Sequence, residues 1–160
     1  MEIRAARTDE AAELSALAFE AKAHWGYSTD VLESWKQLLQ VTDADIAAGR
    51  VFVGTIDGAV VGFYSLAPGA GPWELDNLWV SPGFMRRGLG RELLAHALES
   101  ACRGGALRVT VDADPNAESF YLRSGAVRCG GVPAPIPGDP ERVRPQLAFD
   151  GPEAAWIRAR

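Results

Sequence analysis

The sequence predicts a single layered domain of the α/β or α+β class, built on one mixed sheet and spanning residues 1–160. Three observations support this fold class. The length of 160 residues fits one domain that can bury a core. A hydrophobic content of 48% and a charged content of 23% are ordinary for a soluble globular protein. Apolar residues also change from helical spacing to β-rich runs and back again, as expected when helices are layered on a sheet.

Helices dominate the first part of the chain. Residues 2–6 predict a short opening strand, and Thr8 is expected to cap the first helix. The apolar stripe of this helix is Leu14, Leu17, Ala18 and Ala21. One side of a second helix carries Leu32, Trp35 and Leu39. Thr42 and Asp45 resemble a capping box for a further short helix that ends at Gly49.

Strand patterns then begin. β-Rich runs at residues 51–56 and 59–67 are joined by Asp57-Gly58, a dipeptide that favours a tight hairpin. Residues 73–80 form a third β run, and helical spacing returns after Gly88. The apolar stripe of that helix is Leu89, Leu93, Leu94, Ala97, Leu98 and Ala101.

The last third of the chain completes the sheet. A strand is predicted at residues 106–111, and Asp114-Pro115 opens a helix that runs to Gly125, with Asp as N-cap and Pro at the first helical position. The final strands are residues 126–132 and 144–149. The Pro/Gly-rich stretch at residues 130–145 is expected to be the loop that joins them, since it comes too late to separate two domains.

Composition and charge exclude several classes of protein. The formal net charge is −5, so no general basic surface would attract nucleic acid or anionic lipid. Cys102 and Cys129 form no metal-ligand or redox spacing, and we expect two buried, reduced thiols. The N-terminus lacks the apolar core of a signal peptide, and no apolar run reaches membrane-spanning length. The expectation is a cytoplasmic protein with no nucleic-acid partner, no membrane and no metal.

A glycine-containing segment, MRRGLG at residues 85–90, stands between the third β run and its helix. A helix N-terminus leaves backbone N–H groups unpaired and carries a partial positive charge. Gly88 and Gly90 remove the side chains that would keep a phosphate from that backbone. Added positive charge comes from Arg86, Arg87 and Arg91. The segment fits either an anion-binding cradle or a plain surface turn, and it is neither a Walker P-loop nor a dinucleotide fingerprint.

Two stretches together resemble the GNAT superfamily of acyl-CoA-dependent N-acyltransferases. LDNLWVSPGFMRRGLGRELLAHALESA, residues 75–101, is similar to the family's acyl-CoA-binding motif of strand, Gln/Arg-x-x-Gly-x-Gly/Ala and amphipathic helix. DPNAESFYLRSGA, residues 114–126, resembles the family's downstream Asn/Asp-x-x-Ala-x-x-Phe-Tyr segment. The resemblance implies a GNAT-like fold, with a mixed, mostly antiparallel sheet of about six or seven strands flanked by about four or five helices.

The resemblance also implies how acetyl-CoA would be held. Backbone groups of Leu78, Trp79 and Val80 would pair with its pantetheine arm. Backbone N–H groups that would hold the pyrophosphate belong to Arg86, Arg87, Gly88, Leu89, Gly90 and Arg91. Asn116, or Asp114 in its place, would contact the cofactor near its thiol end. Two departures stand out: Met85 replaces the usual Gln or Arg, and Ala126 replaces an aromatic residue.

The chemistry needs a base and, by the resemblance, an acid. An ammonium acceptor must lose a proton before it attacks a thioester, and a nearby carboxylate can take that proton. Glu74 and Asp76 lie on the same face of one predicted strand; the family places its base at either position, and Glu74 is favoured for its reach. The resemblance makes Tyr121 the acid that protonates the leaving thiolate. The alternatives are ordinary polar residues on a half-exposed strand and a tyrosine that only packs in the core.

The acceptor site is expected at KAHWGYS, residues 22–28, between the first two helices. Its candidate substrate-binding residues are His24, Trp25 and Tyr27. The other interpretation is a helix corner in which Trp25 fills the core and Gly26 permits the turn. His96, the other histidine, falls off the apolar stripe of its helix and is expected to be solvated.

The predicted function is an N-acetyltransferase that moves an acetyl group from acetyl-CoA to a primary amine, by direct attack in a ternary complex. A small-molecule acceptor is favoured. The alternatives are a non-catalytic acyl-CoA-binding sensor or regulatory domain, and an acyltransferase acting on protein N-termini or lysines. A homodimer is left open, since the tail AAWIRAR at residues 154–160 would pack either on a partner or on its own sheet.

Overall fold

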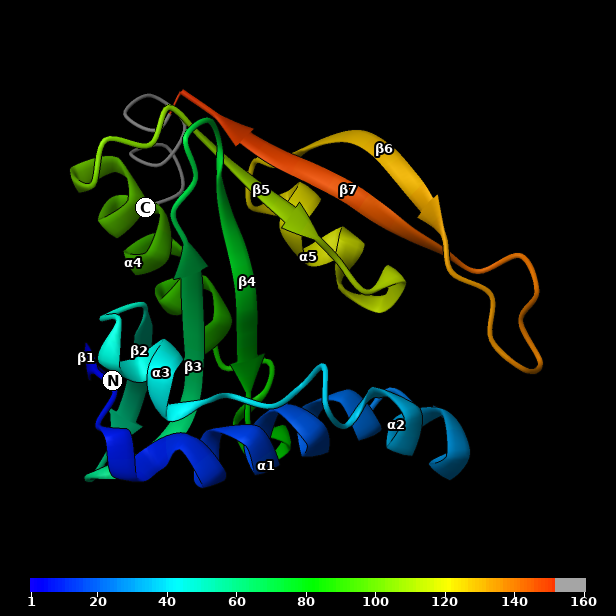
Figure 1. Ribbon diagram of the computed structural model, residues 1–160, viewed down its shortest axis with the longest axis horizontal. Helices are drawn as coiled ribbons and strands as arrows, with labels where there is room; N and C mark the ends of the chain where they lie inside the picture. The colour runs from blue at the N-terminus through cyan, green and yellow to red at the C-terminus, as the bar shows by residue number, and fades with distance from the viewer. Residues whose placement is uncertain (152–160) are drawn as a thin grey trace. The chain divides into compact units, whose positions relative to one another are not determined.

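The computed structural model describes residues 1–151, so the tail at residues 154–160 lies outside the described residues. Within them, seven strands form one sheet in the order β1-β2-β3-β4-β5-β7-β6 (Figure 1). The strands are β1 (Glu2–Ala5), β2 (Val51–Ile56), β3 (Ala59–Ala67), β4 (Trp73–Val80), β5 (Arg108–Asp112), β6 (Val127–Pro133) and β7 (Val143–Asp150). The helices are α1 (Ala11–Ala23), α2 (Thr29–Trp35), α3 (Asp43–Ala47), α4 (Leu89–Arg103) and α5 (Glu118–Arg123). Short 3₁₀ turns are η1 (Thr8–Glu10), η2 (Pro82–Phe84) and η3 (Pro115–Ala117).

The pairing of the strands confirms the predicted mixed, mostly antiparallel sheet. β1 pairs with β2, β2 with β3, β5 with β7 and β6 with β7, all antiparallel. β4 pairs with β5 in parallel, with Glu74 opposite Thr110. The predicted hairpin between β2 and β3 is also confirmed, because Asp57 and Gly58 both have positive φ angles, 50° and 80°.

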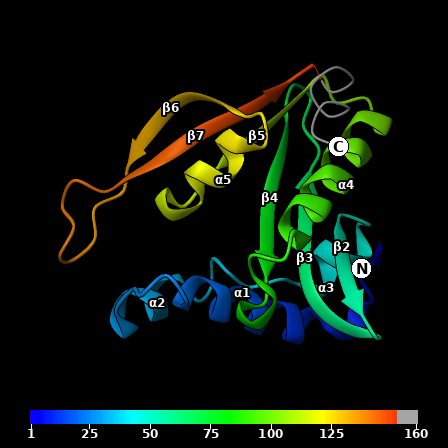
Figure 2. The same ribbon diagram turned by 180° about the vertical axis from the view of Figure 1, so that it is seen from behind.

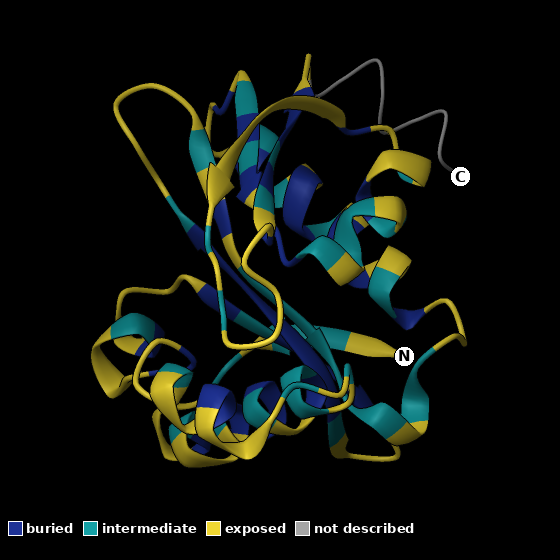
Figure 3. Ribbon diagram, turned by 90° about the vertical axis from the view of Figure 1, so that its right-hand side faces the viewer, coloured by how far each residue is buried: buried dark blue, intermediate teal, exposed yellow. Residues whose placement is uncertain are grey.

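The chain groups into two compact units, and the first comprises residues 1–65 and 77–94. Its core draws on α1, the hairpin and the segment between them. The buried residues of this cluster are Leu14, Leu17, Ala18, Leu39, Val41, Ile46, Val51, Val53 and Phe63. Figure 3 shows α1 with a buried side and an exposed side, as its predicted apolar stripe requires.

Two glycines let the start of α4 approach the hairpin closely (Figure 2). Gly54 of β2 lies opposite Gly62 of β3. A Cβ atom added at Gly62 would come within 2.9 Å of the Leu93 side chain and 2.7 Å of the Trp79 carbonyl oxygen. One added at Gly54 would come within 3.3 Å of the same leucine. Leu93 is fully buried, so the first turns of α4 rest almost directly on the backbone of the hairpin.

The second unit comprises residues 66–76 and the chain from residue 95 onward. Figures 1 and 2 show α5 beside β5 and β7. Val109, Leu147 and Phe149 are buried in this unit. The Trp73 ring covers Gly104 so closely that any side chain there would collide with it, which ties the start of β4 to the end of α4.

The structure corrects several local predictions. Thr8 does not cap α1, because the chain first makes the turn η1, whose N-cap position is Arg7. α2 ends at Trp35, before the buried Leu39. Asp114 does act as an N-cap, but of the turn η3, and α5 begins only at Glu118.

Three other predictions about the later part of the chain also change. The loop expected at residues 130–145 is shorter, because β6 extends to Pro133 and β7 starts at Val143. Both thiols are unpaired, yet neither is buried: Cys102 is half-buried and Cys129 is exposed on β6. His96 is half-buried rather than solvated. Within residues 1–151, every helix is too short or too polar to cross a membrane.

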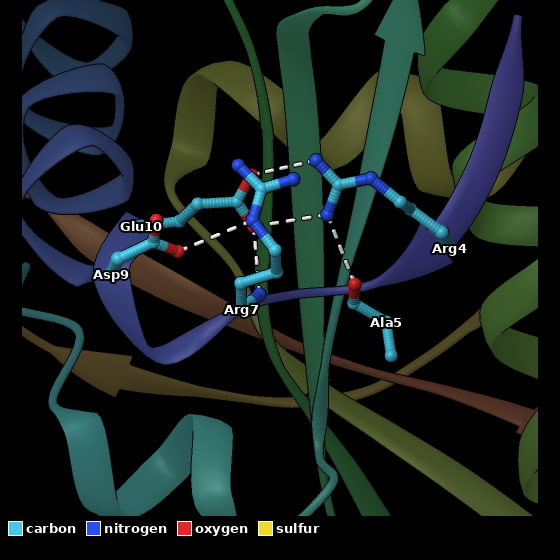
Figure 4. Close-up of polar contacts among 5 residues, drawn as sticks. All are labelled: Arg4, Ala5, Arg7, Asp9 and Glu10. Carbon is cyan, nitrogen blue, oxygen red and sulfur yellow. Dashed lines mark hydrogen bonds and ion pairs between the residues drawn. The ribbon is translucent and has the colours of Figure 1, made fainter.

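Glu10 fastens β1 to the start of α1 (Figure 4). Arg4 donates hydrogen bonds to both of its carboxylate oxygens, at 2.6 and 3.0 Å, and the Arg7 backbone N–H donates at 2.7 Å. The carboxylate side chain is only 4% exposed. These donors lower the pKa of Glu10 to about 2, with the hydrogen bond from Arg4 as the largest cause.

The variant Glu10→Gln is expected to lose about 2 kcal/mol of unfolding free energy at neutral pH, because a buried, charge-assisted network loses its anion. Since the folded pKa of Glu10 is depressed from 4.5 to about 2, its contribution is complete above pH 4.5 and disappears as the pH falls through 2. Denaturant unfolding across this pH range measures the difference. The control Asp9→Asn removes an exposed partner of Arg7 and should change stability by less than about 0.5 kcal/mol. Equal losses in the two variants would contradict this account.

Candidate functional site

A loop at residues 81–88 connects β4 to α4 and is fixed at its start by the hairpin. The Ser81 N–H donates to the Val61 carbonyl at 2.9 Å. The turn η2 follows, closed by a bond from the Phe84 N–H to the Ser81 carbonyl at 2.8 Å. Met85, the departure from the family motif, ends this turn with extended backbone. These bonds carry the chain from the end of β4 to the first turn of α4 along a defined path.

The end of the loop has an unusual backbone. Arg86 and Gly88 both have left-handed conformations, with φ angles of 63° and 86°. Such a conformation costs a non-glycine residue roughly 1–2 kcal/mol, and residues held in this way gather at binding sites. The Gly88 carbonyl accepts the first bonds of α4, from the N–H groups of Arg91 and Glu92 at 3.0 and 3.2 Å. The preceding N–H groups of the helix start therefore have no partner within α4, the arrangement that binds anions.

The side chains of this loop divide into two kinds. Arg86, Arg87 and Gly88 are exposed, so the backbone here is accessible to a ligand. Leu89 is buried and anchors the helix start. The Arg87 guanidinium lies 5.2 Å from the centre of the Phe84 ring, close enough for a cation–π contact that holds its charge beside the loop.

Strand β4 carries the two candidate bases on one face. Glu74 and Asp76 are exposed, and Leu75 between them is buried, as the alternation of a strand requires. The pKa of Glu74 is raised, first by partial burial and then by the negative charges of Asp76 and Asp112. A carboxyl group whose pKa moves toward neutral is better matched to proton abstraction than an unperturbed one.

The second unit also holds Tyr121 and Asn116. Tyr121 of α5 is 6% exposed, and burial raises its pKa well above the ordinary value for tyrosine. Asn116 is exposed, and both its backbone N–H and its side-chain amide donate to Asp114 Oδ1 at 2.8 Å. The other carboxylate oxygen of Asp114 accepts from the buried Arg142 at 3.4 Å. Asp114 is thus a structural cap, which leaves Asn116 as the better candidate for a ligand contact.

The predicted acceptor segment follows α1 in the first unit. His24 is exposed at the C-terminal cap of α1. The Trp25 ring contacts the Trp79 ring of β4, with centroids 5.9 Å apart. Tyr27 packs edge-on against Trp35, with centroids 4.8 Å apart. Trp25 and Tyr27 thus pack against partly exposed aromatic rings, and the acceptor-site interpretation of the segment stays a prediction.

The structure brings the predicted residues together in two groups. In the first unit, the loop, Leu78, Trp79 and Val80 join the acceptor segment through the contact between Trp25 and Trp79. Glu74, Asp76, Asn116 and Tyr121 belong to the second unit. Sequence reasoning named neither Trp35 nor Lys22, the first residue of the acceptor segment, as a site residue, and the structure places the Lys22 ammonium beside the rings of Trp25, Tyr27 and Trp35. The sequence signal for Lys22 is its position at the start of the aromatic stretch KAHWGYS.

A groove of about 1040 Å³ lies elsewhere in the first unit, between α1 and residues 36–44. Its wall contains Ala12, Ala16 and Phe19 of α1 and none of the predicted site residues. Within residues 1–151 no three His, Cys, Asp or Glu side chains cluster closely enough to hold a metal ion. The candidate site residues of each unit therefore stay predictions.

Comparisons with known proteins give matches to acetyltransferases. The family model for the acetyltransferase (GNAT) family matches residues 13–126. A GCN5-related N-acetyltransferase from Rhodopseudomonas palustris is 26% identical, with a TM-score of 0.76 over 93% of this chain and 94% of its own. No curated protein sequence matches the chain.

Two further solved structures are similar in fold. The PaiA N-acetyltransferase from Thermoplasma acidophilum, in complex with coenzyme A, is 20% identical, with a TM-score of 0.73 over 93% of this chain and 98% of its own. YncA from Salmonella typhimurium, with its cofactor acetyl-CoA, is 21% identical, with a TM-score of 0.70 over 94% of this chain and 93% of its own.

Proposed function

Because the chain belongs to the acetyltransferase (GNAT) family, we propose that it transfers an acetyl group from acetyl-CoA to a primary amine of a small molecule. The chain is an acyltransferase of this family, and the proposal concerns its donor, its acceptor and the residues that act. One observation carries the proposal. Arg86 and Gly88, in the loop between β4 and α4, are exposed and have left-handed backbone. That backbone has the donors and the access that a pyrophosphate needs.

The residues present fit the phosphates and the arm of acetyl-CoA. The N–H groups from Arg86 to Gly90 would hold the pyrophosphate, because the Arg91 N–H, also expected to do so, already donates to the Gly88 carbonyl. The exposed Arg86 and Arg87 side chains would add charge. The backbone of Leu78, Trp79 and Val80 would pair with the pantetheine amides. Asn116, oriented by Asp114, would contact the ligand near its thiol end.

Acetyl-CoA supplies the activated acetyl thioester, and the residues of the chain manage the protons. Glu74, with Asp76 as the second candidate, takes a proton from the acceptor ammonium. The freed amine nitrogen would bond to the acetyl carbon as the carbon–sulfur bond breaks, and backbone N–H groups near Val80 would polarise the carbonyl. Tyr121 gives its proton to the departing thiolate. The second proton that the nitrogen loses would restore the Tyr121 hydroxyl, and Glu74 would release the first proton to water. The transfer is direct, in a ternary complex, and neither Cys102 nor Cys129 forms an intermediate.

The test is thiol release from acetyl-CoA in the presence of amines, amino acids, aminoglycoside antibiotics and peptides. At least one small amine should accelerate release and gain an acetyl group by mass spectrometry. Calorimetry with acetyl-CoA and longer acyl-CoAs separates binding from turnover. Binding without turnover of any amine would contradict catalysis and favour a sensor. Transfer confined to peptides would contradict the small-molecule acceptor, and failure to bind any acyl-CoA would remove the proposal.

Tyr121→Phe is expected to lower kcat about tenfold, a modest loss because a thiolate is a good leaving group even without a proton donor. Because burial raises the pKa of Tyr121, the hydroxyl stays protonated throughout the usual assay range. The basic limb of the pH profile should therefore not move in the variant. Phe120→Leu, next to it on α5, is the matched packing control. Unchanged turnover of Tyr121→Phe over the full pH range would contradict the acid role.

A further inference from the structure

Lys22, on the last turn of α1, lies among three aromatic rings. Its Nζ atom is 4.6 Å from the centre of the Trp35 ring, 5.4 Å from that of Tyr27 and 5.8 Å from that of Trp25. Each distance is within the range of a cation–π interaction. The three rings come from the loop after α1 and from the end of α2, so one ammonium group connects elements that are separate in sequence.

The rings are themselves joined in a chain that reaches β4. Tyr27 meets Trp35 edge-on, and Trp25 contacts Trp79. The indole N–H of Trp79 donates to Asn77 at 2.9 Å, and the Asn77 amide donates to Ser65 of β3 at 2.8 Å. Displacement of Trp25 would therefore change the packing of the Trp79 ring, on the strand segment proposed to pair with the pantetheine arm.

The backbone of the segment between α1 and α2 turns at Gly26. Gly26 has a left-handed conformation, with a φ angle of 83°, and a Cβ atom there would meet nothing within 4 Å. Ser28 already serves the next helix as its N-cap, accepting a bond from Val31. Backbone bonds from the N–H groups of Trp25 and Gly26 to α1, at 3.3 and 3.1 Å, hold the chain up to Gly26, and the ring contacts of Trp25 and Tyr27 add to them.

We propose that Lys22 is a positioning residue for the transfer reaction: its ammonium group, held among Trp25, Tyr27 and Trp35, fixes residues 24–28 against Trp79 and so sets the wall that the acceptor amine meets. The inference rests on the proposed function in one respect, namely that this segment forms the acceptor wall. Lys22 does not touch the reacting atoms in this account. It acts through the aromatic rings, which a neutral side chain of the same length would not hold.

The first test uses NMR relaxation of the full chain with acetyl-CoA present. Lys22→Met keeps most of the apolar stem but removes the charge, and the backbone order parameters of residues 24–28 should fall from about 0.85 to below about 0.6. Lys22→Arg keeps a cation that stacks on aromatic rings and should restore the order. The matched control is Lys36→Met, since Lys36 lies 6.0 Å from the Phe19 ring and away from the segment. Unchanged order in Lys22→Met would overturn the proposal.

A double-mutant cycle tells the aromatic contact apart from any other interaction of Lys22. Trp35→Leu removes the nearest ring, and if the contact carries the effect, adding Lys22→Met to it should change the order of the segment little further. Fully additive effects would overturn the proposal.

Kinetics with n-butylamine and acetyl-CoA supply the second readout. In Lys22→Met the KM for the amine should rise about tenfold while the KM for acetyl-CoA stays unchanged, and Lys22→Arg should recover most of the loss. A fall in kcat alone, with both KM values unchanged, would overturn the positioning role. If the wild-type chain acetylates neither n-butylamine nor any amine of the panel, the proposed function fails, and the relaxation measurements still decide whether Lys22 orders the segment.

Discussion

Gly88→Val is expected to raise the Kd for acetyl-CoA about 100-fold, the equivalent of about 2.7 kcal/mol. Gly88 has a φ angle of 86° and ends the loop at the first bonds of α4. A β-branched residue resists this conformation, so the N–H groups that follow would turn away from the phosphates. Each charge-assisted hydrogen bond lost is worth about 1.5–3 kcal/mol. Calorimetric titration with acetyl-CoA measures the change.

Gly105 provides the matched control for this substitution. It follows α4 with a φ angle of 92°, and like Gly88 it has no atom within 4 Å of an added Cβ. Gly105→Val should therefore lose similar stability but keep its affinity for acetyl-CoA. Arg86→Ala should raise the Kd less than about fivefold, because an exposed side chain contributes less than the backbone does. A larger effect for Arg86→Ala than for Gly88→Val would mean that the arginine side chains, and not the N–H groups, hold the phosphates.

Glu74→Gln is expected to lower kcat about 1000-fold, the scale on which a general base acts, and to leave acetyl-CoA affinity unchanged. Because the pKa of Glu74 is raised, the wild-type rate should begin to fall at a pH above the ordinary range of a glutamic acid. Below its pKa the carboxyl group is protonated and cannot take the proton of the ammonium. The pH dependence of kcat/KM measures this limb, which should be absent from the residual rate of Glu74→Gln.

Two further variants decide between the candidate bases. Asp112→Asn removes one of the negative charges that raise the pKa of Glu74, so the acidic limb should move to lower pH. Asp76→Asn should shift the limb in the same direction and cost less activity than Glu74→Gln. If Asp76→Asn causes the larger loss of kcat and Glu74→Gln leaves the limb in place, the base is Asp76.

Much of the fold could be predicted because its signals are local. The apolar stripe of α4, the Asp57-Gly58 turn and the alternation of β4 are each properties of adjacent residues, and each appears as expected. The start of α1 could not be predicted in this way. Thr8 is a good N-cap by type, but Glu10 is also bound by Arg4 of β1, and this contact between two elements favours the turn η1.

Some features of the candidate site also follow from local sequence, and others depend on contacts between distant residues. The loop and the carboxylate pair could be located from spacing, because a strand, a loop and a helix follow one another in the chain, and their proposed roles came from the family resemblance. The assignment of Asp114 to a structural role depends on Arg142, 28 residues away. The contact of Lys22 with the Trp35 ring depends on how the end of α2 packs beside α1. Neither contact can be predicted from the order of residues, since both form only when the chain folds.

Gly54 and Gly62, which lie beneath Leu93, are expected to tolerate substitution less well than the loop that precedes α4. Since the first turns of α4 rest on the backbone at Gly54 and Gly62, these two positions help to set the direction of the helix. Met85, in the loop that leads into the helix, is then expected to be a less sensitive position. A side chain at Gly62 would instead lift the helix, and with it every N–H group proposed to face the phosphates. The sites of mutational intolerance should therefore include positions in the hairpin that no ligand ever touches.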